Sequence, residues 1–228
     1  MWRVLDEPLE IAASLETLGW SQFLANEPKA LNTFEELLRV VSEIGDPVLI
    51  NRAKVGLAQI LVALSQVDEA RPIAHEIIEY SRKVGDRRSE HSGFHFLADC
   101  ALIAGRCDES VALYRESLEL ARAIGDRLET GFEVEGVAMS LACLGDARTA
   151  IRLQAAVHAE LARHGINLRI QFWDALVDRY FVPARAALGA AAESTAEAGA
   201  ALAFEAAVVE ALEVSGRAVR KTSTGTRQ

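Results

Sequence analysis

The tripeptide Ile44-Gly45-Asp46 recurs as Val84-Gly85-Asp86 and again as Ile124-Gly125-Asp126. With Gly165, these glycines fall at positions 45, 85, 125 and 165, so the spacing is 40 residues each time. A fixed period of this length is typical of helical-repeat proteins, because one pair of helices cannot bury its own apolar face and stacks on a neighbouring pair. The sequence therefore predicts an all-α fold, a right-handed α-solenoid of about four helix pairs.

The recurring tripeptide also predicts where helices end and begin. A glycine favours the left-handed backbone conformation that closes a helix, and the aspartate after it can accept hydrogen bonds from the free amides of the next helix. Pro47 suits the first turn of such a helix, where its missing N–H costs no hydrogen bond. We therefore expect helix pairs at 7–44, 47–84, 87–124 and 127–164.

The first helices of the pairs share a large apolar residue followed by alanine, as in Leu57-Ala58, Leu97-Ala98 and Val137-Ala138. A second alanine column follows at Ala70 and Ala150. Small residues at such positions let two helices approach closely. These columns resemble the tetratricopeptide repeat, whose usual unit of about 34 residues is lengthened here by roughly one helical turn.

The C-terminal part of the chain narrows this resemblance. Residues 150–159 and 199–208 are similar to the end of large bacterial ATP-dependent regulators of the LuxR-type, SARP-type and cyclase-associated classes. In that family a nucleotide-binding switch domain precedes a tetratricopeptide-like sensor region, so the resemblance implies a protein- or peptide-binding sensor module. The phosphate-binding pattern GxxxxGK[ST] does not occur in the chain, and we therefore do not expect the ATPase of such regulators on it.

The expected domain organisation follows from the repeat. Tetratricopeptide-like repeats are expected over residues 1–166, C-terminal capping helices over 167–213 and a disordered polar tail over 214–228. Pro183 is expected to bend or break one of the capping helices, because proline removes a backbone donor. The exposed ends of the solenoid could also join two copies of the chain into a homo-oligomer.

The composition bounds the classes of function. The 228 residues carry a formal net charge of -9, which argues against direct nucleic-acid binding by the main body. Neither a signal peptide nor an apolar run of about 20 residues is present, so we expect a cytoplasmic protein that does not bind membranes. The cysteines are odd in number and lack CxxC spacing, so we expect neither a disulfide framework nor a zinc site; Cys100 and Cys143 are expected to be small buried apolar residues.

The first helices of the pairs are expected to line a concave groove that binds the partner. The usual groove positions of the repeat fall on polar residues with apolar interruptions, namely Arg52, Val55, Gln59, Ser92, His95, Asp99, Phe132, Glu135 and Met139. Such a surface suits an extended or helical peptide, whose backbone needs donors and acceptors and whose side chains need pockets. The expected partner is therefore a protein or peptide, and we expect no cofactor, no bound metal and no enzymatic activity.

Other interpretations of these residues stay open. His91, His95 and Asp99 lie four residues apart, with Glu135 in the next repeat, and two histidines at this spacing can share a metal ion. Because no further ligand motif accompanies them, we expect a solvated or peptide-facing stripe instead. A stand-alone protein that binds signalling peptides is the main alternative to a regulator module. An enzyme that uses His95 as a base beside Asp99 or Glu135, or a small-molecule binder, is a further alternative.

An aromatic segment follows the fourth helix pair. Phe172, Leu176 and Tyr180 recur at every fourth residue, with Trp173 and Phe181 beside them, so one helix carries a wide apolar stripe. This stripe is expected to cover the open end of the solenoid. The alternative is a ligand pocket between this helix and the fourth pair, because aromatic side chains often line such pockets.

Overall fold

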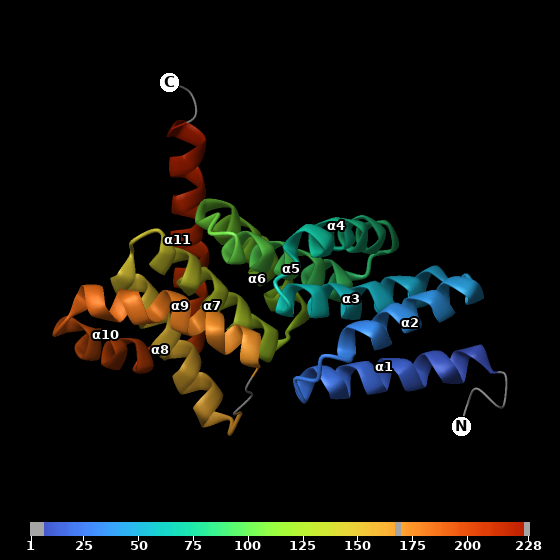
Figure 1. The fold of residues 1–228 in the computed structure, drawn as a ribbon. Helices are drawn as coiled ribbons and strands as arrows, with labels where there is room; N and C mark the ends of the chain where they lie inside the picture. The colour runs from blue at the N-terminus through green and yellow to red at the C-terminus, as the bar shows by residue number, and fades with distance from the viewer. Residues whose placement is uncertain (1–6, 167–169, 226–228) are drawn as a thin grey trace. The chain divides into compact units, whose positions relative to one another are not determined.

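The computed structural model describes residues 7–166 and 170–225, with side chains as far as residue 218. These described residues form helices and contain no strand (Figure 1). The predicted all-α fold is therefore confirmed. The helices are α1 (Pro8–Leu24), α2 (Ala30–Ile44), α3 (Pro47–Ala63), α4 (Val67–Val84), α5 (Arg87–Ile103), α6 (Cys107–Ile124), α7 (Arg127–Cys143), α8 (Ala147–Arg163), α9 (Gln171–Leu188), α10 (Ala191–Ala200) and α11 (Phe204–Gly225).

The chain divides into two compact units, Met1–Phe96 and Leu97–Gln228. Helix α5 belongs to both, because the division falls within it. The repeat period gives no indication of this division, since the same helix pattern continues through it.

The ends of the helices are formed by the residues that the sequence predicts. Gly45 and Gly125 both close a helix in the left-handed conformation, each with a φ of 78°. The side chain of Asp46 then accepts a hydrogen bond of 2.8 Å from the amide of Val48. Asp126 caps α7 in the same way, through a bond of 3.2 Å from the amide of Glu129. The predicted glycine stops and aspartate caps are therefore confirmed.

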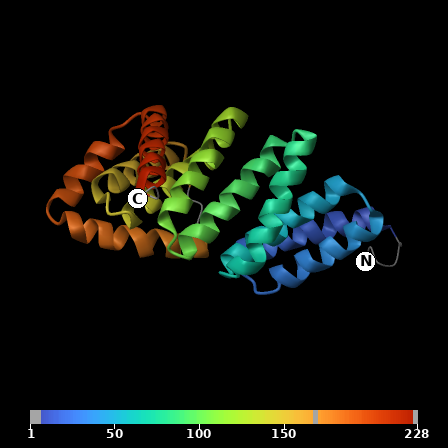
Figure 2. The same cartoon turned by 90° about the horizontal axis from the view of Figure 1, so that it is seen from above.

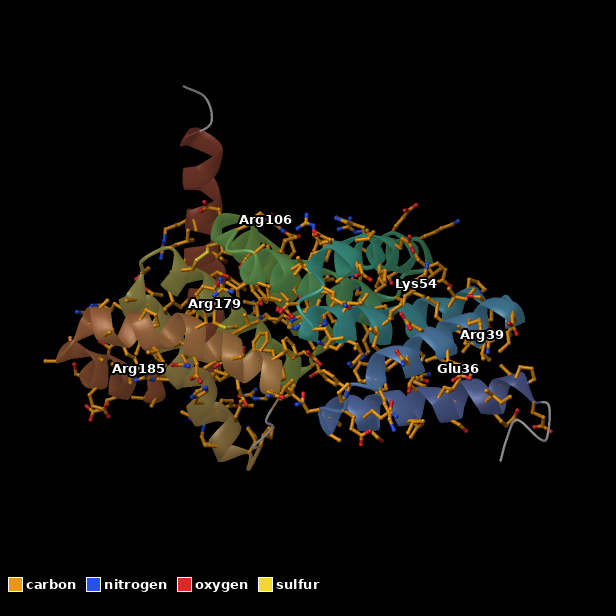
Figure 3. The ribbon with its side chains drawn as sticks, viewed as in Figure 1. Glu36, Arg39, Lys54, Arg106, Arg179 and Arg185 are labelled. Atoms are coloured by element: carbon orange, nitrogen blue, oxygen red, sulfur yellow. A yellow bond between two sulfur atoms is a disulfide. The ribbon has the colours of Figure 1, made fainter. Side chains whose placement is uncertain are left out.

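In the first unit, α1 packs on α2, α2 on α3 and α3 on α4. The ring of Phe34 from α2 is fully buried in this packing. A Cβ atom at Gly19 of α1 would come within 2.7 Å of that ring, and one at Gly56 of α3 within 2.0 Å. The two glycines therefore make room for the phenylalanine between neighbouring helices. Lys54 Nζ lies 2.7 Å from Glu76 Oε2, and this ion pair links α3 to α4. Lys54 is labelled in Figure 3.

In the second unit, α7 packs against both α6 and α8. Helix α9 packs on α7 and α8, α10 packs on α8, and α11 packs across α6, α7 and α8 (Figures 1 and 2). Their shared core contains fully or almost fully buried side chains from each of α6, α7, α8, α9 and α11, among them Tyr114, Met139, Leu153, Phe181 and Val208. These contacts position α9 against the fourth helix pair.

The C-terminal region differs from the sequence prediction in two ways. Pro183 does not break α9, which continues to Leu188; Phe181 and Ala184 are buried on either side of the exposed proline. Helix α11 continues to Gly225, so residues 214–225 of the expected disordered tail are helical. Val214 and Ser215 are buried, and this packing carries the helix past the end of the repeat-like pattern.

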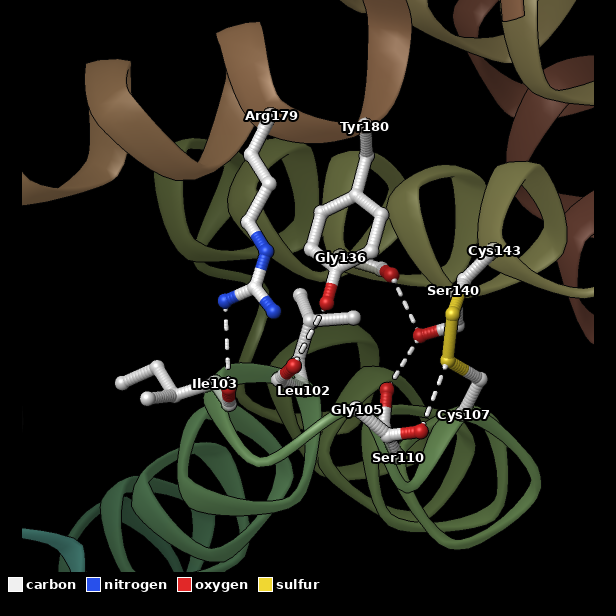
Figure 4. Close-up of a disulfide and its surroundings, with 10 residues drawn as sticks. All are labelled: Leu102, Ile103, Gly105, Cys107, Ser110, Gly136, Ser140, Cys143, Arg179 and Tyr180. Carbon is white, nitrogen blue, oxygen red and sulfur yellow. Dashed lines mark hydrogen bonds between the residues drawn. A yellow bond between two sulfur atoms is a disulfide. The ribbon is translucent and has the colours of Figure 1, made fainter. Parts of the chain in front are cut away.

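The expectation of unpaired cysteines is wrong for two of them. Cys107 at the start of α6 and Cys143 at the end of α7 form a disulfide, with a Cα–Cα distance of 6.1 Å (Figure 4). Consecutive packed helices bring the first residue of one beside the last residue of the next, which a count of cysteines does not indicate. Cys143 is exposed and not a buried apolar residue, whereas Cys100 is fully buried, as expected.

Candidate binding pocket

A pocket of about 560 Å³ lies between α7, α8 and α9 in the second unit. This volume is within the range of sites that bind small molecules or several side chains of a peptide. Its apolar walls are formed by Leu128, Phe132, Leu161, Ala162, Ile166, Trp173 and Val177, and its polar side chains are Glu135, His158, Asp174 and Asp178. The alternative interpretation of the aromatic segment, a pocket between its helix and the fourth pair, thus corresponds to a cavity in the structure.

Glu135 is the most buried ionisable residue of this pocket, with 5% of its surface exposed. Its Oε2 atom accepts a hydrogen bond of 2.7 Å from the indole Nε1 of Trp173. Its Oε1 atom lies 2.9 Å from Nε2 of His158. Side chains from two other helices, α8 and α9, therefore contact this carboxylate. It accepts from the indole and, when His158 carries a proton on Nε2, from the imidazole as well.

Two aromatic rings meet at the pocket. The ring centroids of Phe132 and Trp173 are 5.4 Å apart and the ring planes form an angle of 89°, which is an edge-to-face arrangement. The indole is fixed at its nitrogen by Glu135. Leu176, Tyr180 and Phe181 are buried in the core, whereas Phe172 is half-buried. The hydroxyl of Tyr180 donates to the carbonyl of Leu102 at 2.6 Å (Figure 4). Helix α9 therefore both lines the pocket and covers the end of the helix pairs of this unit.

The pocket is acidic. Asp174 and Asp178 lie one turn apart on α9, so both carboxylates are on the same face of the helix as Trp173 and Val177. Together with Glu135 they place three carboxyl groups and one histidine around the cavity. Neither lysine nor arginine occurs among the described residues that line it. Electrostatic complementarity therefore favours a positively charged ligand.

The predicted groove residues of the first unit lie on α3 and α5. Arg52 is exposed and forms an ion pair with Glu16 of α1; both line a small pocket of about 250 Å³. Val55 and Gln59 are half-buried, and the buried Nε2 atom of Gln59 has no hydrogen-bond partner among the described residues. On α5, the hydroxyl of Ser92 donates to the carbonyl of Arg88 at 3.2 Å, and His95 is buried with its ring stacked on that of His91.

Some of the predicted groove residues of the second unit line the pocket, and others are buried. Phe132 and Glu135 both line the pocket between α7, α8 and α9. Met139 and Asp99 are fully buried, so neither side chain is available to a partner in this structure, contrary to the prediction. Met139 packs in the apolar core, and Asp99 accepts a hydrogen bond from the hydroxyl of Tyr114. Burial and the neighbouring Asp99 charge raise the pKa of Tyr114 well above its ordinary value.

The carboxylates invoked in the metal and enzyme hypotheses already have hydrogen-bond partners in the second unit. Asp99 is bound by Tyr114, and Glu135 by Trp173 and His158. The structure therefore gives these two groups a hydrogen-bonding role that the spacing of His91 and His95 does not reveal.

Two residues that line the pocket, His158 and Asp178, are not among the predicted groove residues. His158 contacts Glu135 because α7 and α8 are packed side by side, and spacing along the sequence does not indicate this contact. Asp178 was not singled out at all. Its signal is present in the sequence, since Asp174 and Asp178 repeat at helical spacing beside the aromatic stripe.

The comparisons with known proteins agree with this architecture. Residues 49–123 match the family model of the tetratricopeptide repeat. Over these residues the helical-repeat fold is of the tetratricopeptide type. Repeats of this type generally mediate protein–protein interaction. The search of curated proteins finds no match. None of the described helices combines the length and the apolar character that crossing a membrane requires.

Proposed function

We propose that this chain is a protein- or peptide-binding module that holds its partner on the first helices of its repeats. One observation carries the proposal. Phe132 and Glu135, which occupy the usual groove positions of the repeat, both line a cavity of about 560 Å³ in the second unit. In a tetratricopeptide fold, a cavity on a first helix is where a partner side chain is expected to enter.

The chemistry of the cavity supports a peptide as the partner. The walls combine aliphatic and aromatic side chains with a few polar groups. This is the composition of sites that orient a ligand and exclude water. Glu135 and Trp173 are held in place by their mutual hydrogen bond before any partner binds. Such preorganisation reduces the entropy lost on binding and so favours affinity.

A phage-displayed library of random peptides of about 12 residues, selected on the chain, tests this proposal. We expect the selected peptides to slow amide hydrogen exchange in α7 and α9. Phe132→Ala should weaken their binding by about tenfold or more, as expected for an aromatic residue at the centre of an interface. Leu113→Ala is the matched control, because Leu113 is half-buried in the same unit and does not line the pocket.

Circular dichroism of both variants shows whether the helices are retained. Peptides that bind without protecting α7 or α9, or that bind Phe132→Ala and wild type equally well, would contradict the proposed site. A selection that yields no binding peptide would contradict the proposed function itself.

We further propose that this module belongs to a cytoplasmic signalling or transcriptional regulator. The support is the resemblance of residues 150–159 and 199–208 to the end of such regulators. The coding sequence adjoining this segment provides the test. We expect it to encode a nucleotide-binding domain in the same reading frame, and a frame without one would contradict this assignment while leaving peptide binding untouched.

A further inference from the structure

We propose that the pocket between α7, α8 and α9 binds an arginine side chain of the partner, with the guanidinium beside Glu135 and the aliphatic part of the side chain against Phe132 and Trp173. This inference rests on the proposed function, since it names the residue type that the peptide-binding pocket recognises.

The charge of the pocket selects a cation. Its described lining contains the carboxyl groups of Glu135, Asp174 and Asp178 and no basic side chain other than His158. The three carboxyl groups come from two helices, α7 and α9, and surround one cavity. A partner carboxylate or phosphate would meet like charge here, whereas a cation would offset it.

Glu135 is the centre of the proposed contact. It is 95% buried, and a buried carboxylate is costly unless a cation or several donors stabilise its charge. Each of its two oxygens has one neighbouring nitrogen, from Trp173 and from His158. Because a carboxylate has about four acceptor positions, both oxygens can still accept from a guanidinium in the cavity.

The aromatic rings explain why arginine is favoured over lysine. The planes of Phe132 and Trp173 are perpendicular, at 89°, so a flat group that stacks on one ring meets the edge of the other. A guanidinium is planar and weakly hydrated, and it can stack on a ring while donating to a carboxylate. The same protein places Arg127 4.9 Å from the ring centroid of Phe204 and Arg179 5.3 Å from that of Tyr180.

The size of the cavity implies that arginine is bound together with a neighbour. Its volume of about 560 Å³ is in the class of sites that hold a whole drug-sized ligand rather than one side chain. Leu128, Leu161 and Val177 provide apolar wall beyond the two rings. We therefore expect an apolar residue beside the arginine in the bound peptide.

The test compares two capped peptides that have one arginine, or one citrulline, between two leucines. Citrulline keeps the shape of arginine and removes its charge. We expect the arginine peptide to shift the indole N–H resonance of Trp173 in a nitrogen–proton correlation spectrum and to bind at least about tenfold more tightly than the citrulline peptide. Its affinity should also fall as salt is added.

Glu135→Gln identifies the carboxylate that carries this preference. Glutamine has the same shape and can still accept from Trp173 while its amide faces His158, so the fold should be retained. We expect this variant to bind arginine and citrulline peptides with nearly equal affinity. Asp178→Asn, at an exposed position, should reduce the preference to a smaller extent. Glu116→Gln is the matched control, because Glu116 is exposed on α6 and does not line the pocket. This variant should leave the preference for arginine over citrulline unchanged.

Different failures separate the two proposals. Equal binding of arginine and citrulline peptides at the pocket, or library peptides that protect α7 and α9 but lack arginine, would overturn the arginine assignment and leave peptide binding intact. An arginine preference that survives Glu135→Gln would overturn the assigned contact. Absence of any peptide at the pocket would overturn both proposals.

Discussion

Gly136 lies directly against the ring of Tyr114, so that a Cβ atom at this glycine would come within 2.4 Å of the tyrosine Cε1. The ring, on α6, therefore packs on the backbone of α7 where α7 has no side chain. Gly56 and Phe34 have the same relationship in the first unit, with a corresponding distance of 2.0 Å. In both units a large ring on a second helix is accommodated by a glycine on the next first helix.

The repeat period shows how this packing varies along the chain. One period after Phe34 and Gly56, the corresponding residues are Ala74 and Phe96, so the large and the small residue have exchanged helices. A further period on, at Tyr114 and Gly136, the original order returns. The combined volume is conserved more closely than either residue, which is what a tightly packed interior requires.

Gly136→Ala should therefore destabilise the protein by about 1–3 kcal/mol, because the added methyl group meets the buried ring of Tyr114. Urea unfolding measures the change. Gly131→Ala on the same helix is the matched control: its Cβ would be 3.7 Å from Val157 Cγ1, an ordinary contact. That control should stabilise α7 by about 0.5–1 kcal/mol, since alanine is the better helix former.

In a Tyr114→Leu background, Gly136→Ala should lower the free energy of unfolding by less than it does in the wild type, because the smaller leucine side chain leaves room for the added methyl group. A double-mutant cycle isolates this coupling from the other effects of losing the tyrosine. Equal penalties in both backgrounds would contradict the proposed steric origin.

Tyr114→Phe should change how stability depends on alkaline pH. Burial, followed by the nearby Asp99 charge, raises the pKa of Tyr114 well above its ordinary value, so the folded protein keeps the phenol neutral. The unfolded chain ionises it near pH 10. The contribution of this group is therefore fully present below pH 10 and is lost as pH rises further, at up to about 1.4 kcal/mol per pH unit.

Tyr114→Phe should not show the loss of stability above pH 10 that ionisation of Tyr114 causes in the wild type. At pH 7 the variant should be less stable by about 1.5–3 kcal/mol, because Asp99 loses a hydrogen-bond donor. The free energy of unfolding in urea at several pH values between 8 and 11 measures both effects. Parallel curves for variant and wild type across this range would show that Tyr114 does not control the alkaline transition.

The features that the sequence predicted correctly depend on neighbours along the chain. A glycine stop and an aspartate cap involve residues within one turn of each other, so Gly125 and Asp126 reveal a helix boundary by themselves. The phase of the repeat likewise places Phe132 and Glu135 on the first helix of the fourth pair. The aromatic spacing around Trp173 indicates a helix that covers the end of that pair.

The features that the sequence did not reveal depend on which helices pack together. Met139 and Asp99 share the phase of the groove positions, yet the neighbouring helices bury them completely. Cys107 and Cys143 are 36 residues apart, and only the packing of α6 on α7 brings them together. His158 contacts Glu135 for the same reason, across α7 and α8.

Cys143→Ser should lower the free energy of unfolding by about 3–4 kcal/mol under oxidising conditions, because the disulfide closes a loop of 36 residues in the unfolded chain. Cys107→Ser should have a similar effect, and the double variant should be little worse than either single one, since all three remove the same bond. Adding a reductant should destabilise the wild type alone. A wild type that responds to the reductant no more than the variants do would contradict the bond.

Glu160→Gln should selectively remove stability at neutral pH. The hydrogen bond from Arg127 lowers the pKa of Glu160; burial opposes this effect, while the charge of Arg127, the hydrogen bond from His164 and the charge of Arg163 add to it. A carboxylate whose pKa is lower in the folded state stabilises the protein above its unfolded pKa, near 4.3, and this contribution is lost as pH falls through the folded value. We expect the variant to be less stable by about 1 kcal/mol at pH 7, and the difference to close as the wild-type carboxylate becomes protonated.

Glu205→Gln is the matched control, because Glu205 also pairs with Arg127, at 3.5 Å, but its side chain is 65% exposed. It should change stability by less than about 0.5 kcal/mol. Urea unfolding between pH 3 and 7 distinguishes these outcomes, and a constant difference between Glu160→Gln and wild type over that range would refute the role assigned to the Arg127 contact.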